Sequence, residues 1–294
     1  MTQSGSPDER TLLRAEIERA VAELDAAGVP SPRSDAMALA ADALGVDRLT
    51  LAVPPPVPDD FPTRYRWLIG RRAAREPLQH ILGFAWFRRV RVEVRPGVFV
   101  PRPETELVAG AAIDEACTTG TGAPLVVDLC TGTGAIAAAV ADEVPSARVI
   151  AVDVDPAAVK LARANLAEFG DRIRVELADV TSPDLLAEFA GTVDVVVSNP
   201  PYIPPDAVPA DPEVHDHDPA RALYGGGVDG LDVPREVIAA AQRLLRPGGL
   251  LVMEHGDEQG PAVRAMVEGT GGFADIRTRP DLTGRDRYVL ARRR

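Results

Sequence analysis

The chain has 294 residues, of which 46% are hydrophobic and 26% charged. These values exclude a largely disordered protein and, at this length, favour two domains. The sequence has neither an apolar run long enough to cross a membrane nor the apolar stretch of a signal peptide, so we expect a cytoplasmic protein. Two cysteines are too few for a disulfide framework or a cysteine metal cluster, and we expect no metal site.

The net charge of −12 is unevenly distributed, because residues 101–294 carry −13 and residues 1–100 carry +1. An acidic surface repels phosphate backbones, so we expect no direct binding to DNA. One basic cluster has only Glu76 as an acidic neighbour in the sequence, and it consists of Arg71, Arg72, Arg75, Arg88, Arg89 and Arg91. The cluster is either solvated surface or a docking surface for an acidic or nucleic-acid-bearing partner.

The first 75 residues have the pattern of a small helical domain. Leucine, isoleucine and valine recur at helical spacing from Leu12 to Leu24, and Gly28 and Pro30 end that helix. Two more helices are expected, over residues 31–45 and 61–75. We therefore predict a helical domain over residues 1–75, which we expect to dock a substrate.

Residues 76–104 are predicted to be a β-hairpin connector. Alternating hydrophobic residues run from Phe84 to Val94 and resume at Val98, which fits two strands that turn at residues 95–97. Pro103 suits the first turn of a following helix, and the acidic residues beside it suit the positive end of that helix.

From residue 105 to 294, short apolar strands alternate with helices. We predict five buried strands, then two more near the end of the chain, at residues 125–129, 148–152, 173–177, 193–197, 250–254, 275–278 and 287–291. Helices are expected between them at residues 135–143, 156–169, 183–190 and 232–246. This alternation is typical of an α/β domain whose largely parallel sheet is covered on both faces.

A glycine-rich turn follows the first predicted strand of this domain. It reads Asp-Leu-Cys-Thr-Gly-Thr-Gly from Asp128 to Gly134, and its glycines let the backbone approach a ligand at the positive end of the next helix. Asp153 ends the second strand, where its carboxylate can accept both hydroxyls of a ribose. These residues predict a site for an adenosine-bearing cofactor.

A second motif, Asn-Pro-Pro-Tyr at Asn199–Tyr202, follows the fourth strand. The prolines stiffen the loop and leave carbonyl acceptors free. The Asn199 side-chain oxygen and the Pro200 carbonyl can each accept one N–H of an NH₂ group, which aims the nitrogen at an electrophilic methyl group. Tyr202 offers a flat face to the planar acceptor and to the methyl sulfonium region. This arrangement predicts methyl transfer to a planar nitrogen.

Together, these motifs resemble those of class I S-adenosylmethionine-dependent methyltransferases. The chain is most similar to the release factor glutamine methyltransferases (PrmC/HemK family) over about residues 10 to 291. The segments that carry this resemblance are Glu76–Gly83, Phe99–Glu106, Val196–Ile203, Glu254–Gly256 and Gln259–Gly260. It implies a Rossmann-like, seven-stranded methyltransferase domain over residues 105–294, after the helical domain and the hairpin.

The resemblance also implies an activity, which is methylation of the side-chain amide nitrogen of the glutamine in the Gly-Gly-Gln motif of class I peptide chain release factors. S-adenosyl-L-methionine would be the cofactor. Carried over by position, the residues that border it are Cys130, Thr131, Gly132, Thr133, Gly134, Asp153, Asp179, Val180 and Asn199. The residues that hold the target glutamine and serve catalysis would be Asn199, Pro200, Pro201 and Tyr202.

Two positions depart from the family pattern. Cys130 stands where relatives commonly have glycine, and Val180 stands where they often have an aromatic residue. The second difference removes an aromatic ring that could pack on adenine, whereas the chemistry of transfer is unaffected.

Other functions remain open on the sequence alone. The Asn-Pro-Pro-Tyr loop is shared with nucleic-acid amine methyltransferases that act on DNA adenine or ribosomal RNA guanine, although the acidic charge argues against them. A nicotinamide-dependent oxidoreductase would explain the glycine turn but not Asn199–Tyr202. His215 and His217 are expected to be polar surface, and His255 a packed residue rather than a base.

Overall fold

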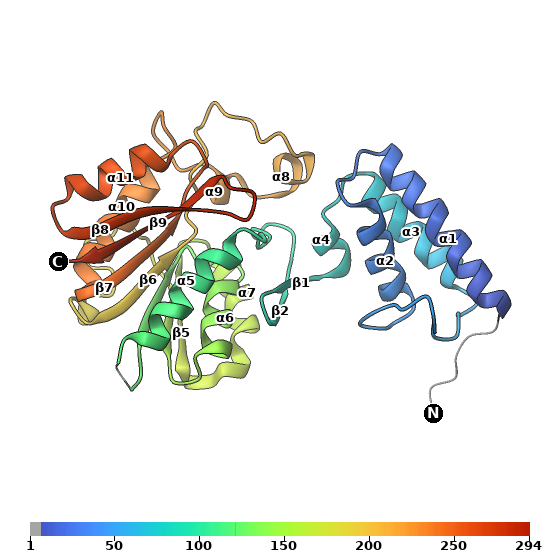
Figure 1. Ribbon diagram of the computed structural model, residues 1–294, viewed down its shortest axis with the longest axis horizontal. Helices are drawn as coiled ribbons and strands as arrows, with labels where there is room; N and C mark the ends of the chain where they lie inside the picture. The colour runs from blue at the N-terminus through green and yellow to red at the C-terminus, as the bar shows by residue number, and fades with distance from the viewer. Residues whose placement is uncertain (1–6, 121) are drawn as a thin grey trace. The chain divides into compact units, whose positions relative to one another are not determined.

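The computed structural model describes residues 7–120 and 122–294, which divide into two compact units (Figure 1). The first unit runs to Gly83 and also includes Asp211–His217, and the second holds Phe84–Ala210 and Asp218–Arg294. A short segment that follows the Asn-Pro-Pro-Tyr loop in the sequence thus belongs to the helical unit. Nothing in the sequence pattern indicated this.

The first unit is helical, as predicted. Its helices are α1 (Pro7–Ala26), α2 (Pro32–Ala43), α3 (Phe61–Ala73), the short α4 (Leu78–Leu82) and, from the distant segment, α8 (Pro212–His217). Leu13, Ile17 and Leu24 lie on one face of α1 and are fully buried against α2 and α3. The buried hydroxyl of Tyr65 donates to the Ala36 carbonyl at 3.0 Å, so this polar group has a hydrogen-bond partner inside the core.

A buried group of ion pairs lies in this unit. Arg72 donates to Asp35 at 2.8 Å and to Glu213 at 2.6 Å, and Arg75 donates to Glu213 at 2.8 Å. Arg72 is 5% exposed and Glu213 is 6% exposed. Burial raises the pKa of Glu213, but the hydrogen bonds from Arg75 and Arg72 outweigh it and hold the pKa below its ordinary value. We call these four residues the Glu213 cluster.

The basic cluster seen in the sequence is therefore mostly consumed by ion pairs. Arg72 and Arg75 belong to the Glu213 cluster, Arg71 pairs with Glu76, and Arg88 pairs with Glu143. Three of these four side chains pair with acidic residues that are far away in the sequence, so the pairing could not be seen in the local pattern. Arg89 is held more weakly than these four, because its Nε lies 3.6 Å from a carboxylate oxygen of Asp142 and its side chain is largely exposed.

The hairpin forms, but its predicted turn is wrong. Strand β1 (Phe84–Phe87) pairs antiparallel with β2 (Val90–Glu93), so the chain turns at Arg88 and not at residues 95–97. Arg88 takes a positive φ of 51°, which is unusual for a side chain of this size. Its guanidinium is held by Glu143 and by the Glu106 carbonyl, and these contacts favour the turn.

The second unit is built on a seven-stranded sheet, as predicted. Its strands are β3 (Leu125–Leu129), β4 (Arg148–Asp153), β5 (Ile173–Leu177), β6 (Val193–Ser198), β7 (Leu245–Glu254), β8 (Phe273–Pro280) and β9 (Asp286–Arg293). The strand order is β5-β4-β3-β6-β7-β9-β8. The first five are parallel in this sheet, and β9 pairs antiparallel with both β7 and β8.

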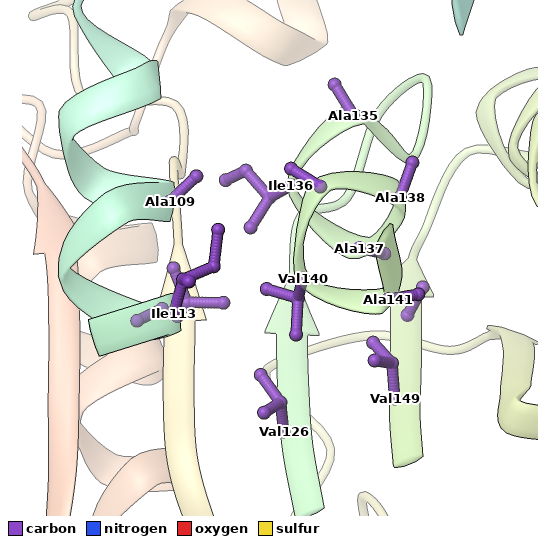
Figure 2. Close-up of a cluster of buried hydrophobic side chains, with 14 of the residues drawn as sticks. Ala109, Ile113, Val126, Ala135, Ile136, Ala137, Ala138, Val140, Ala141 and Val149 are labelled. Atoms are coloured by element: carbon purple, nitrogen blue, oxygen red, sulfur yellow. The ribbon is translucent and has the colours of Figure 1, made fainter. Parts of the chain in front are cut away.

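Helices cover both faces of this sheet, because apolar residues of the strands form two separate buried clusters. They are α5 (Thr105–Thr118), α6 (Ala135–Glu143), α7 (Pro156–Asn165), α10 (Asp232–Leu244) and α11 (Gly260–Gly269). The short helix α9 (Ala220–Leu223) also belongs to this unit. Figure 2 shows Ala109 and Ile113 of α5 beside Ile136 and Val140 of α6, with Val126 of β3 beneath them. The many alanines of α6 let it lie close to the strands.

Some predicted bounds differ from the structure. The helix expected at 183–190 is reduced to one 3₁₀ turn, η2 (Ala187–Phe189), because Leu186 before it takes a left-handed conformation with φ 48°. The helix expected at 156–169 ends at Asn165 and gives way to η1 (Ala167–Arg172). In the described part of the chain, no helix has both the length and the apolar content that crossing a bilayer requires.

Candidate functional site

The carboxyl ends of β3, β4, β6 and β7 lie at one edge of the sheet because these strands are parallel. Leu129 is in register with Val152 on one side and with Ser198 on the other, and Ser198 is in register with Met253. The residues that follow these strands therefore gather at one edge, where open parallel sheets bind ligands.

The glycine turn between β3 and α6 is held from several sides. The Thr131 hydroxyl donates to Asp128 at 2.6 Å, and the Gly132 N–H donates to Asp153 at 2.8 Å. Gly134 has a φ of 83°, and a Cβ there would lie 3.0 Å from the side chain of Leu166, so only glycine fits without strain. The Thr133 carbonyl accepts from Asn165 at 2.8 Å. The turn is thus a rigid frame.

Asp153 also supports this frame. Its second oxygen accepts from the Asp155 N–H at 2.9 Å. Burial raises the pKa of Asp153, and its backbone hydrogen bonds act in the opposite direction. In the neighbouring strand, burial raises the pKa of Asp128 to about 7. Asp128 is fully buried and Asp153 is half-buried, so water reaches neither carboxyl group freely.

Cys130 adopts a positive φ of 62°, a backbone conformation that favours glycine. A side chain in the left-handed region costs about 1–2 kcal/mol. Burial raises the pKa of the thiol, so the reactive thiolate is disfavoured. Cys130 is therefore a small side chain with an unreactive thiol.

Asp179 and Val180 follow β5, next to the end of β4. The Ala178 N–H donates to the Asp153 carbonyl at 3.0 Å, which joins the ends of these two strands. Asp179 is exposed and accepts from the Thr181 N–H at 2.8 Å, whereas Val180 is 9% exposed and packs with Leu185. Their proposed contact with adenine stays a prediction.

The Asn-Pro-Pro-Tyr loop leaves β6 at the same edge. Asn199 is half-buried, and its Nδ2 donates to the Thr105 hydroxyl at 3.1 Å. That hydroxyl donates to one oxygen of Glu254 at 2.8 Å, and the Tyr202 hydroxyl donates to the other at 3.2 Å. Burial raises the pKa of Glu254 to about 7. A buried polar chain therefore links Asn199, the start of α5 and the end of β7.

Further residues hold the backbone of this loop. Gln259 donates to the Tyr202 carbonyl at 2.8 Å, and Ile203 pairs with the segment at Leu223–Gly225 through two backbone hydrogen bonds. A Cβ on Gly230 would lie 2.3 Å from the Tyr202 carbonyl oxygen, and one on Gly225 would lie 2.6 Å from that of Pro201. Any side chain at these glycines would displace the loop.

Sequence reasoning did not assign a role in the site to Thr105, Glu254, Gln259, Gly225 or Gly230. The first three lie within the segments that carry the family resemblance, and that was the available signal. The two glycines lie in a run, Gly-Gly-Gly-Val-Asp-Gly, whose meaning depends on which backbone lies against it.

The histidines play no part in this geometry. His255 is fully buried, its Nδ1 lies 2.7 Å from the Gly256 carbonyl, and burial lowers its pKa, which favours a neutral ring. His215 pairs with Asp216 in α8. Among the described residues, no group of three or more His, Cys, Asp or Glu is arranged to hold a metal ion.

Two family models match the chain. One described as the PrmC N-terminal domain matches residues 17–83, and one described as the methyltransferase small domain matches residues 95–210. A curated protein of Mycolicibacterium smegmatis named release factor glutamine methyltransferase is 50% identical over 284 residues, covering 96% of this chain and 98% of that relative.

Two other similarities are informative. A Streptomyces pristinaespiralis protein named 4-amino-L-phenylalanine/4-methylamino-L-phenylalanine methyltransferase is 41% identical, covering 92% of this chain and 91% of that relative. The solved structure of a Thermus thermophilus 16S rRNA N2 G1207 methyltransferase, in complex with AdoMet and guanosine, has a TM-score of 0.51. It is 22% identical and covers 72% of this chain and 50% of that chain, so this likeness bears on the fold alone.

Proposed function

The chain belongs to the release factor glutamine methyltransferases, and we propose that it transfers a methyl group from S-adenosylmethionine to the glutamine side chain of the Gly-Gly-Gln loop in class I release factors. The observation that carries this proposal is the free acceptor pair at the sheet edge. Within the described residues, Asn199 Oδ1 has no protein donor, while its Nδ2 is engaged by Thr105. Its action in the cytoplasm stays a prediction from the sequence.

The residues at the edge fit the cofactor. Cys130–Gly134 and Asp153 are proposed to hold its methionine and ribose parts, and Asp179 and Val180 to border adenine. The fit rests on a glycine turn with free room at Gly132, where a Cβ would meet nothing within 4 Å, and on the acid that ends β4. When bound, S-adenosylmethionine supplies an electrophilic methyl group on sulfur.

The protein's contribution to the reaction is to orient the acceptor. An amide nitrogen is a poor nucleophile because its lone pair is delocalised into the carbonyl. Asn199 Oδ1 and the Pro200 carbonyl are proposed to accept its two N–H groups, which places the lone pair in line with the methyl group. As the nitrogen–carbon bond forms and the sulfur–carbon bond breaks, these oxygens stabilise the positive charge that develops on nitrogen. One proton then leaves to water.

Methyl transfer from labelled S-adenosylmethionine tests this proposal. The acceptors are a purified class I release factor, the same factor with Gly-Gly-Ala in place of Gly-Gly-Gln, unmethylated duplex DNA and 4-amino-L-phenylalanine. We expect label on the intact factor alone. Label on DNA would replace the proposal with the nucleic-acid alternative, and label on 4-amino-L-phenylalanine alone would move the substrate to free aromatic amines.

Two variants separate the roles of acceptor and cofactor residues. We expect Asn199→Ala to lower kcat on the release factor by about 100-fold or more, because one of two orienting acceptors is lost, with cofactor affinity changed less than about twofold. We expect Asp153→Ala to weaken cofactor binding about tenfold or more. Calorimetry and single-turnover transfer measure the two properties. Equal loss of both in Asn199→Ala would contradict this division.

A further inference from the structure

Asn199 lies at one end of a hydrogen-bonded chain whose other members are almost completely withdrawn from water. Thr105 is 4% exposed and Glu254 is 2% exposed. Thr105 is the first residue of α5, and Glu254 is the last residue of β7, next to β6 in the sheet. The side chain of Asn199 is therefore held directly by α5 and, through Thr105, indirectly by β7.

The direction of each hydrogen bond in this chain follows from the number of protons available. An ionised carboxylate only accepts hydrogen bonds, and a threonine hydroxyl has one proton to donate. That proton is committed to Glu254, 2.8 Å away, so toward Asn199 the hydroxyl oxygen can only accept. Asn199 must then present its NH₂ group to Thr105, 3.1 Å away, and its oxygen must point elsewhere.

We infer that Thr105 and Glu254 are positioning residues that fix the Asn199 amide in the one orientation whose oxygen receives the acceptor's N–H. This inference deepens the proposed function and rests on it. An amide is nearly symmetrical in shape, so packing alone does not distinguish its two orientations. The reversed orientation would present an N–H to the N–H of the substrate, and the hydrogen bond would be lost.

The protonation state of Glu254 decides whether this control operates. A protonated Glu254 can donate to Thr105, which frees the threonine proton for Asn199 Oδ1 and permits the reversed amide. The groups that face Glu254 are the hydroxyls of Thr105 and Tyr202, the carboxylate of Glu104 and the guanidinium of Arg287 on β9. With the pKa of Glu254 raised to about 7, the competent, ionised form is lost as the pH falls below neutrality.

The composition of the chain makes the orientation directly observable, because it contains two asparagines, Asn165 and Asn199. Asn165 is a built-in control, since its amide binds Glu93 and Thr133 and does not contact the Glu254 chain. In protein labelled with ¹⁵N-asparagine, we expect the Asn199 side-chain NH₂ signals to move between pH 6 and pH 8. We expect the Asn165 signals to stay, and Glu254→Gln to abolish the movement.

Variants of Thr105 then connect orientation to rate. Thr105→Val keeps the shape but removes the acceptor, so we expect displaced Asn199 signals and a kcat about 10- to 100-fold lower, with KM and cofactor affinity changed less than about twofold. Thr105→Ser keeps the hydroxyl, so we expect the Asn199 signals and kcat to match those of the unchanged protein. Thr192→Val is the matched control, because its hydroxyl bonds only the Phe189 carbonyl, just before the amino end of β6.

The outcomes distinguish this inference from the proposed function. Displaced Asn199 signals in Thr105→Val, in a protein that does not methylate release factors, would uphold the positioning role and reject the substrate. Unchanged Asn199 signals in Thr105→Val would overturn the positioning role, whatever the acceptor. Because the competent form is lost below neutrality, we also expect kcat to fall as the pH drops from 8 to 6. If Glu254→Gln showed the same fall in kcat, the part assigned to Glu254 would be overturned.

Discussion

Glu213 in the helical unit and Glu254 in the sheet unit are both buried, and the two are held in opposite ways. Glu213 in the helical unit accepts from two arginines, Arg72 and Arg75. Glu254 in the sheet unit accepts from two hydroxyls, those of Thr105 and Tyr202. The pKa of Glu213 lies below its ordinary value, whereas that of Glu254 is raised to about 7.

The difference indicates two uses of a buried carboxylate. Charged partners keep Glu213 ionised throughout the ordinary pH range, so it fastens α8 to the helical unit without responding to its surroundings. Hydroxyl partners compensate the charge of Glu254 only in part, so its charge is costly and its protonation state can change. Such an arrangement gives little stability but gives directional control over Asn199.

The largest effect is expected from neutralising Glu213. Glu213→Gln removes the charge that compensates the buried Arg72, and we expect the helical unit to lose about 3 kcal/mol of stability. Hydrogen exchange measured by mass spectrometry on peptides of α2, α3 and α8 reports this loss. Unchanged protection would mean that Asp35 alone compensates the charge of Arg72 and that Glu213 does not stabilise the helical unit.

An intermediate effect of opposite sign is expected at Glu254. Burial raises the pKa of Glu254 from 4.5 to about 7, so the folded state binds this proton more tightly than the unfolded state does. The contribution of Glu254 to the free energy of unfolding is therefore fully present below about pH 4.5 and is lost as the pH rises through 7, by about 3 kcal/mol at most. We expect Glu254→Gln to slow hydrogen exchange in β6 and β7 at pH 8 and to change it little at pH 5. For Glu213, whose pKa is lowered, the contribution is present above pH 4.5 and is lost in acid.

The smallest effect is expected at Arg75, whose side chain is 23% exposed. Arg75→Met leaves Glu213 paired with Arg72, so we expect a loss of about 1 kcal/mol in the helical unit. The same exchange peptides as for Glu213→Gln provide the measurement. If Arg75→Met lost as much stability as Glu213→Gln, Arg75 rather than the buried Arg72 would be the partner that holds Glu213 in the helical unit.

The sequence predicted what local pattern and known motifs determine. The strand at Leu125–Leu129 and the glycine turn after it follow from apolar residues and glycines adjacent in the chain. The turn at Arg88 was missed because its backbone conformation is held by Glu143, which comes much later in the chain. The Glu213 cluster was missed for the same reason, since an arginine cluster does not reveal its distant acidic partners.

The candidate site was predictable to the same extent. Asn199–Tyr202 and Asp153 were identified from the residues that follow predicted strands, and their functional roles remain predictions. The contacts of Asn199 with Thr105 and through it with Glu254 depend on how α5 packs against β6 and β7. No local pattern specifies that packing, although the resemblance to the family singled out both segments.

The membership of Asp211–His217 in the helical unit means that this unit cannot be excised as a single stretch of chain. A truncation that begins after Gly83 would take away Arg72 and Arg75 and leave Glu213 without either cation. The orphaned segment would lie a few residues after the Asn-Pro-Pro-Tyr loop, where its disorder would be confused with loss of substrate docking. A variant that removes the whole helical unit must therefore begin after Gly83 and must also join Ala210 directly to Asp218, so that Asp211–His217 are deleted.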